Sequence, residues 1–207
     1  MRVIRRSSTT FLFAAAAALS FAAPAGAQMY SDGYKFMEAV KEKKGEDAQA
    51  LLDKPGSTVV NARDLSNGRT ALHLVVERRD LTWIKWLAQE GANPNIADNN
   101  GVTPLILATQ LGFIEGVEAL IKAGAQVDVA NKSGETPLIF GVHSRNRDLM
   151  EALLKAGADP DRRDNSGRSA RDYAVERGAD PRMVEAIVEH AKPASEREGA
   201  KVYGPSF

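Results

Sequence analysis

The sequence predicts an all-α fold, a solenoid of stacked helix-turn-helix units joined by short β-turn arms, with about five repeats including divergent caps. The first observation is a fixed period, because a glycine recurs every 33 residues. The second is a signature, Gly-Ala followed by a short polar stretch, that closes each central unit. Two motifs at one period indicate an array in which each unit contacts only its neighbours. The periodic glycines are Gly68, Gly101, Gly134 and Gly167, and the closing glycines are Gly91, Gly124 and Gly157.

Residues 1–27 have the features of a secretory signal peptide. Three arginines lie among the first six residues, and no acidic residue precedes Asp32. The apolar run at 11–23 would span about 20 Å as a helix, which is short of the roughly 30 Å hydrocarbon core. Small residues follow the run, so we expect cleavage between Ala27 and Gln28.

This leader predicts a periplasmic or secreted protein with no membrane insertion after its removal. The alternative, a buried N-terminal helix, would need a polar face, and the apolar run has none. General secretion is favoured over twin-arginine export, because the apolar run begins well downstream of Arg5 and Arg6.

Composition excludes several classes of function. The 207 residues include no cysteine, which excludes disulfides, thiolate metal sites and a cysteine nucleophile. The 27 basic side chains are balanced by 27 acidic ones. The chain therefore lacks the excess positive charge by which most nucleic-acid-binding proteins attract phosphate, and we expect no nucleic-acid partner.

The N-terminal unit, residues 28–66, is predicted to be a divergent capping repeat. It lacks the Thr-Pro-Leu motif of the central units but keeps two helical segments and a similar polar exit. Seven residues separate Asn61 from Gly68, whereas six separate Asn95 from Gly101, so the first arm holds one extra residue.

Each central unit is predicted to contain two helices. Thr70, Thr103 and Thr136 lie where a hydroxyl can cap the first helix, and in two units a proline follows at the first helical position, where its missing N–H costs nothing. An apolar stripe continues for about two turns, and a second helix ends at the closing glycine, which tolerates a left-handed conformation. The predicted repeats are 67–99, 100–132 and 133–165.

The C-terminal unit, residues 166–190, is predicted to be a capping repeat. Arg171 stands where the central units have leucine, and Asp172 stands at the position of His73. A polar outer face is what a terminal repeat requires. Residues 191–207 are polar and interrupted by Pro and Gly, so we predict a disordered tail.

These units closely resemble ankyrin repeats, whose pattern is Gly-x-Thr-Pro-Leu-His-x-Ala at 33 residues. The segments Gly101-Val-Thr-Pro-Leu and Gly134-Glu-Thr-Pro-Leu match it, and His73 matches the motif histidine. The resemblance covers roughly residues 30–190. It implies that His73 makes a structural hydrogen bond to neighbouring backbone, and that the turn tips and first helices form a concave binding side.

The resemblance also implies a set of partner-binding positions on that concave side. Neither the apolar stripe nor the turn geometry dictates these side chains, so they are free to serve recognition. They include arginines and an apolar residue, types that often dominate interface energies. The positions are Ser66, Asn67, Arg69, Glu77, Arg78, Asn99, Asn100, Val102, Gln110, Leu111, Lys132, Ser133, Glu135, His143 and Ser144.

No catalytic or metal site is predicted, and we expect no cofactor. The three histidines, His73, His143 and His190, have no second histidine at metal-ligand spacing. The glycine-rich phosphate loops, the nucleophile elbow and the zinc-protease motif are absent. The pair Trp83 and Trp86 is expected to pack in the core rather than to form an exposed site.

The leading hypothesis is a non-catalytic protein–protein interaction module, an exported ankyrin-repeat scaffold that binds a partner protein through its concave face. We expect it to be monomeric. Two alternatives stay open: an accessory or chaperone-like stabiliser of one exported enzyme, and a small-ligand sensor or enzyme.

Overall fold

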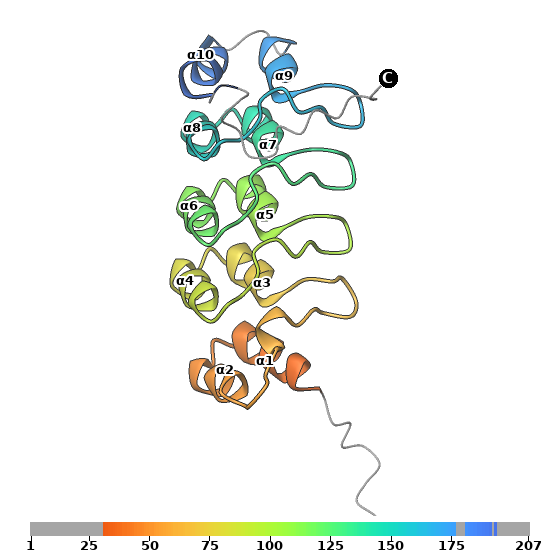
Figure 1. Cartoon of the computed structure of the whole chain (residues 1–207), viewed down its shortest axis with the longest axis vertical. Helices are drawn as coiled ribbons and strands as arrows, with labels where there is room; N and C mark the ends of the chain where they lie inside the picture. The colour runs from red at the N-terminus through yellow and green to blue at the C-terminus, as the bar shows by residue number, and fades with distance from the viewer. Residues whose placement is uncertain (1–30, 177–180, 192, 194–207) are drawn as a thin grey trace, which may run out of the picture.

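The computed structural model describes residues 31–176, 181–191 and 193, which form a stack of helix pairs (Figure 1). The predicted signal peptide, and all but two residues of the predicted tail, lie outside the described residues. No helix within the described part of the chain is long and apolar enough to cross a membrane. The helices are α1 (Asp32–Lys41), α2 (Gly45–Leu52), η1 (Val59–Asn61), α3 (Ala71–Glu77), α4 (Leu81–Gln89), α5 (Pro104–Gln110), α6 (Ile114–Lys122), α7 (Pro137–His143), α8 (Arg147–Lys155), α9 (Ala170–Glu176) and α10 (Pro181–His190).

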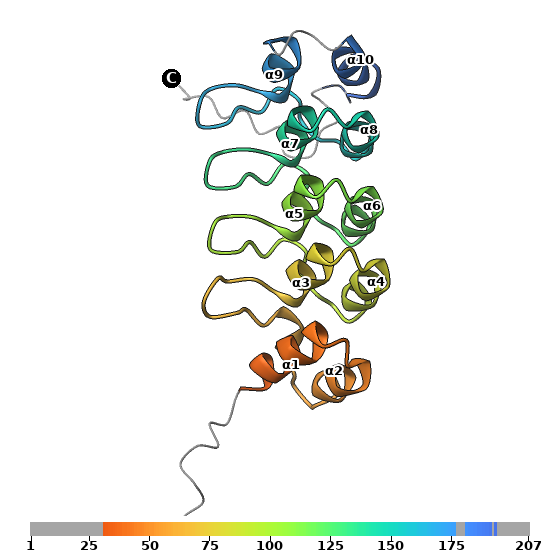
Figure 2. The ribbon, with the colours of Figure 1, turned by 180° about the vertical axis from the view of Figure 1, so that it is seen from behind.

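The helices form two layers, as Figures 1 and 2 show from opposite sides. The inner layer consists of α1, α3, α5, α7 and α9, the first helices of the units. The outer layer consists of α2, α4, α6, α8 and α10. The arms between units all project on the side of the inner layer. The predicted all-α solenoid is confirmed.

Local sequence explains where the inner helices begin. The Oγ1 atoms of Thr103 and Thr136 accept hydrogen bonds from the backbone three residues later, both at 3.3 Å. Thr70 is capped differently, because its backbone N–H donates to Nδ1 of His73 at 3.1 Å. These caps satisfy N–H groups that a helix start would otherwise leave unpaired.

The core is continuous along the stack because each repeat covers the apolar side of the next. The motif leucine of the inner helix and a leucine of the outer helix are buried in every central repeat. A single repeat could not bury these side chains, so stability comes from the interfaces between neighbours. The buried leucines are Leu72, Leu105 and Leu138 in the inner layer and Leu87, Leu120 and Leu153 in the outer layer.

Backbone hydrogen bonds connect the tips of neighbouring arms. At each step, an N–H in one tip donates to a carbonyl of the preceding tip, at 2.8, 3.2 and 3.1 Å. The pairs are Asn99 with Asn67, Lys132 with Asn100, and Asn165 with Ser133.

Side-chain oxygens connect the arms again at their bases. Each accepts a hydrogen bond from the backbone N–H of the following unit, at 2.7, 2.8 and 2.9 Å. The pairs are Asn61 with Asn93, Asn95 with Gln126, and Asp128 with Asp159. The arms therefore form a continuous polar wall beside the apolar stack.

The tip glycines have a backbone conformation that glycine adopts far more readily than other residues. Gly101 and Gly134 have φ values of 77° and 80°, in the left-handed region. A Cβ on Gly134 would also lie 2.6 Å from the backbone nitrogen of Asn165, because the next arm passes directly against it. Glycine is required there for two reasons, its φ angle and the close approach of the neighbouring arm.

The extra residue of the first arm enlarges its tip. The N–H of Gly68 donates to the carbonyl of Asp64, four residues earlier, whereas Gly101 donates to Asp98, three residues earlier. The longer turn leaves the side chain of Leu65 fully exposed to solvent.

At the C-terminal cap, polar side chains replace the contacts that another repeat would make. Arg171 pairs with Asp161 at 2.7 Å instead of entering a core. Asp172 accepts hydrogen bonds from the N–H and hydroxyl of Ser169 at 3.0 and 2.9 Å. Asp172 thus caps its helix as His73 does. Unlike His73, whose Nε2 bonds the carbonyl of Val102 in the next arm, it has no second polar group for a following repeat.

The two tryptophans pack against the core from the outer layer but stay partly exposed. The rings of Trp83 and Trp86 meet edge to face, with centroids 4.9 Å apart. The guanidinium of Arg78 lies 5.2 Å from the Trp83 ring centroid, a cation–π distance. The pair therefore has a structural role near the first repeat boundary.

We expect Gly134→Ala to destabilise the protein more than Gly167→Ala. Both glycines have φ near 80°, so a Cβ should cost about 1 kcal/mol or more at either position. Only at Gly134 would the Cβ also meet a neighbouring arm, since nothing lies within 4 Å of it at Gly167. Urea unfolding followed by circular dichroism measures the difference, and equal losses of stability would contradict the crowding argument.

Candidate functional site

The predicted partner-binding residues lie on the arms and along the inner helices, and they differ in exposure. Nine of them are exposed: Ser66, Asn67, Glu77, Asn99, Asn100, Gln110, Lys132, Ser133 and Ser144. The others are half-buried: Arg69, Arg78, Val102, Leu111, Glu135 and His143. We call the surface formed by the arm tips and the exposed sides of α3, α5, α7 and α9 the inner surface.

The expectation that structure does not dictate these side chains is wrong for Arg78. Its guanidinium donates to the carbonyl of Val40 in the N-terminal cap and lies 3.3 Å from the carboxylate of Asp80. It also lies over the ring of Trp83. Arg78 therefore connects the cap to the first full repeat.

The expectation also needs correction for three residues around the second arm. The carbonyl of Val102 accepts a hydrogen bond from His73 at 2.9 Å, and the side chains of Val102 and Leu111 pack against the core. Asn99 donates through Nδ2 to the carbonyl of Ser66 at 3.3 Å. These contacts stabilise the stack. A partner that bound at these positions would contact residues that already have a structural role.

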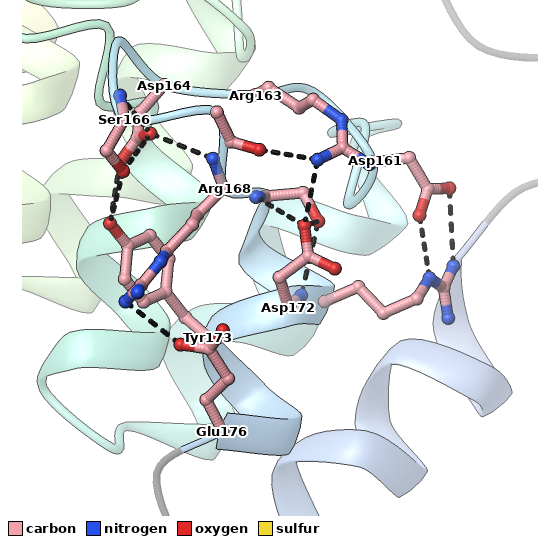
Figure 3. A network of polar contacts seen from close by, with 11 residues as sticks. Asp161, Arg163, Asp164, Ser166, Arg168, Asp172, Tyr173 and Glu176 are labelled. Carbon is pink, nitrogen blue, oxygen red and sulfur yellow. Dashed lines mark hydrogen bonds and ion pairs between the residues drawn. The ribbon is translucent and has the colours of Figure 1, made fainter.

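The exposed part of the inner surface differs along the stack. Over the first two repeats Arg69 and Glu77 form an ion pair at 3.0 Å, and the residue equivalent to Glu77 in the next repeat is the neutral Gln110. Over the last two repeats the surface carries a polar network built around Tyr173 (Figure 3).

Tyr173 is held in place from several directions. Its hydroxyl donates to Oδ2 of Asp164 at 2.7 Å and lies 3.2 Å from the hydroxyl of Ser166. The guanidinium of Arg168 lies 5.7 Å from the ring centroid and pairs with Glu176 at 2.9 Å (Figure 3). A ring with so many contacts loses little further freedom when a partner binds.

The same network keeps Asp164 ionised. Partial burial opposes its charge, but hydrogen bonds from Ser166, Tyr173 and the backbone of Arg168 outweigh that effect. Together they hold the pKa of the Asp164 carboxyl well below its ordinary value.

Sequence reasoning did not identify two aromatic residues of this region, Phe140 and Tyr173. They stand at the same helix position, 33 residues apart, in α7 and α9. Phe140 is half-buried and lies outside the core cluster, and His143, one turn further along α7, meets the Tyr173 ring edge to face at 4.7 Å. The repeat register could have found them, because the equivalent residues of the first two repeats are Leu74 and Leu107.

Among the residues that the structure describes, His73 is the most deeply buried titratable group, and its contacts are structural. Its Nδ1 accepts from the backbone N–H of Thr70, so its Nε2–H donates to the carbonyl of Val102 in the next arm. Burial lowers the pKa of His73 from its ordinary value. A neutral ring with both nitrogens engaged has no free atom for acid–base catalysis.

Two further features bear on chemistry. The described residues contain no group of three or more His, Asp or Glu side chains that could hold a metal ion. An open groove lies at the bases of the arms, lined by 124–130 together with Asn95, Ile121, Ala156 and Arg162. Its lining has no pairing of a nucleophile with a base, and none of the candidate residues contributes to it.

Two family models match the chain. One, described as ankyrin repeats (3 copies), matches residues 36–131, and the other, ankyrin repeats (many copies), matches residues 120–174. Together they span the cap, the central repeats and the start of the last unit. Comparison with curated proteins gives no match.

We expect His73→Ile to reduce the dependence of stability on pH. Because the pKa of folded His73 is lowered, the unfolded chain takes up a proton below about pH 6.5 that the folded chain refuses. Stability from this group is therefore complete above that pH and is lost as the pH falls towards the lower, folded pKa. Isoleucine is the residue at the equivalent positions Ile106 and Ile139.

The measurement is the free energy of unfolding between pH 7 and pH 5 for both proteins. His143 and His190 are present in each, so their contributions cancel in the comparison. Parallel curves for the wild type and His73→Ile would show that His73 does not titrate as its burial requires.

Proposed function

Because the chain belongs to the ankyrin repeat family, whose members are generally protein–protein interaction modules, we propose that it binds a partner protein along its concave inner surface. The observation that carries the proposal is that one set of side chains maintains the stack and a different, exposed set does not contribute to it. Buried leucines and arm hydrogen bonds maintain the stack. Side chains such as Glu77, Gln110 and Ser144 are exposed on the inner helices or directly after them and contribute nothing to the core.

We propose further that the role is non-catalytic, as is typical of the family. The buried histidine supports this, since both of its ring nitrogens bind the protein itself. The carboxylate of Asp164, whose pKa lies well below its ordinary value, is likewise engaged by the hydroxyls of Ser166 and Tyr173.

The proposed site of action is the periplasm or the exterior of the cell. The support is in the sequence, where a basic start, a short apolar run and small residues precede Gln28. Intact-mass analysis of the exported protein should give a chain that begins at Gln28. A chain recovered from the cell envelope with Met1 still present would refute this proposal.

The binding proposal predicts that Glu77→Arg combined with Gln110→Arg prevents partner capture. Two added arginines on the inner surface create unpaired charge at the interface, so affinity should fall at least about tenfold. Both positions are exposed, so thermal unfolding should stay close to wild type. Affinity capture with mass spectrometry identifies the partner, and calorimetry measures its affinity.

The matched control is Gln89→Arg combined with Glu118→Arg, the same two changes at exposed positions of the outer helices α4 and α6. It should bind the partner like the wild type. If the control fails to capture the partner and the variant with Glu77→Arg and Gln110→Arg still captures it, the partner binds the outer helices instead.

A further inference from the structure

We propose that the partner, which contacts the inner surface along several repeats, places on the last two repeats an acidic segment carrying an aromatic or large aliphatic side chain. This inference rests on the proposed function and specifies which segment of the partner binds at the C-terminal part of the inner surface and what chemistry it brings. The docking surface, which we call the aromatic patch, consists of Phe140, His143 and Tyr173, with Lys132 and Arg145 on either side of α7.

The aromatic patch supplies apolar area that the fold does not use. The equivalent of Phe140 in the preceding repeat, Leu107, is buried in the core cluster, whereas Phe140 is half-buried and lies outside it. Tyr173 packs against the core and remains partly exposed. Aromatic rings in this state are typical of the residues that dominate binding energy.

The Tyr173 side chain of the patch is held in place before any partner arrives. Its hydroxyl donates to Asp164 at 2.7 Å (Figure 3), and its ring meets His143 edge to face at 4.7 Å. Preorganised side chains lose little entropy on binding, which favours affinity.

Three acidic groups near the rings of the patch are already engaged. Glu176 pairs with Arg168 at 2.9 Å, and Glu135 accepts from Asn131 at 3.0 Å with His143 at 4.0 Å. Asp164 accepts from Ser166 and Tyr173. None of these carboxylates offers an unsatisfied charge to a basic partner.

Two cations that flank α7 in the chain have no side-chain partner among the described residues. Lys132 is exposed at the arm tip that precedes α7, and Arg145 is exposed directly after α7. Within residues 31–176, 181–191 and 193, neither side chain makes an ion pair or hydrogen bond. An approaching carboxylate would meet uncompensated positive charge at both ends of the helix.

The earlier repeats lack this arrangement. At the position of Arg145, the cap has Lys43, which pairs with Asp80 at 3.5 Å, and the first repeat has Arg79, which donates to the carbonyl of Leu111. The second repeat has Gly112 there. Half-buried aromatic rings, together with cations that have no partner among the described residues, therefore mark the third and fourth repeats, and their charge complement is an acidic segment.

The test uses a phage-displayed library of random dodecapeptides, selected on the folded full-length chain. Enriched peptides should place Asp or Glu beside Phe, Trp or Leu. Calorimetry with a synthesised enriched peptide should show at least about tenfold weaker binding to the Lys132→Glu and Arg145→Glu double variant. Phe140→Ala should weaken binding by a similar factor.

The matched control is Lys85→Glu combined with Lys122→Glu, which makes the same change in charge at exposed positions of the outer helices α4 and α6. It should alter affinity less than about twofold, because exposed charges beyond a Debye length are screened. Equal losses in both charge variants, enriched peptides that are neutral or basic, or no enriched peptide at all would overturn the inference. The proposed function would still stand in these cases if Glu77→Arg with Gln110→Arg abolished partner capture.

Discussion

The contact between neighbouring repeats is the interaction on which the rest of the structure depends. Each repeat meets the next twice, through buried leucines such as Leu72 and Leu105 in the inner layer and through backbone hydrogen bonds between arm tips. The leucines and the arm tips must both reach the next repeat, so the distance between neighbouring repeats has to be the same for the helix pairs and for the arms. The constant 33-residue period satisfies this requirement, and the close approach of the arms explains why Gly134 cannot carry a side chain.

This constraint also determines which side chains are available for binding. Residues that connect one repeat to the next have both polar ends engaged: Asn95 bonds the next unit through both side-chain atoms, and His73 bonds Thr70 of its own repeat and Val102 of the next. Exposed side chains on the inner helices are not needed for contacts between repeats, so their chemistry can differ from repeat to repeat. The result is an inner surface that is mixed in charge over the first repeats and aromatic, with unpaired cations, over the last ones. A repeat scaffold can in this way carry a local site without any change in its fold.

The repeat register predicted the positions of the candidate residues well and their contacts less well. Arg78 lies at the predicted end of α3, but its guanidinium bonds to Val40 in a cap that has no matching motif, 38 residues earlier. Phe140 and Tyr173 were missed because the apolar stripe of a helix does not reveal which of its members the next repeat will cover. Exposure of that kind depends on the neighbouring side chains, which lie a full repeat away in the sequence.

The sequence by itself determined the solenoid, the helix caps at Thr103 and Thr136, and the left-handed glycines at the tips, because these follow from local backbone chemistry repeated at a constant period. It also predicted the polar C-terminal cap, since Arg171 replaces a core leucine. Only the tertiary structure decided that Arg78 is a structural contact and that Tyr173 is fixed by Asp164 and His143. The reason is physical: these contacts join side chains from different repeats, and their geometry exists only after the repeats have stacked.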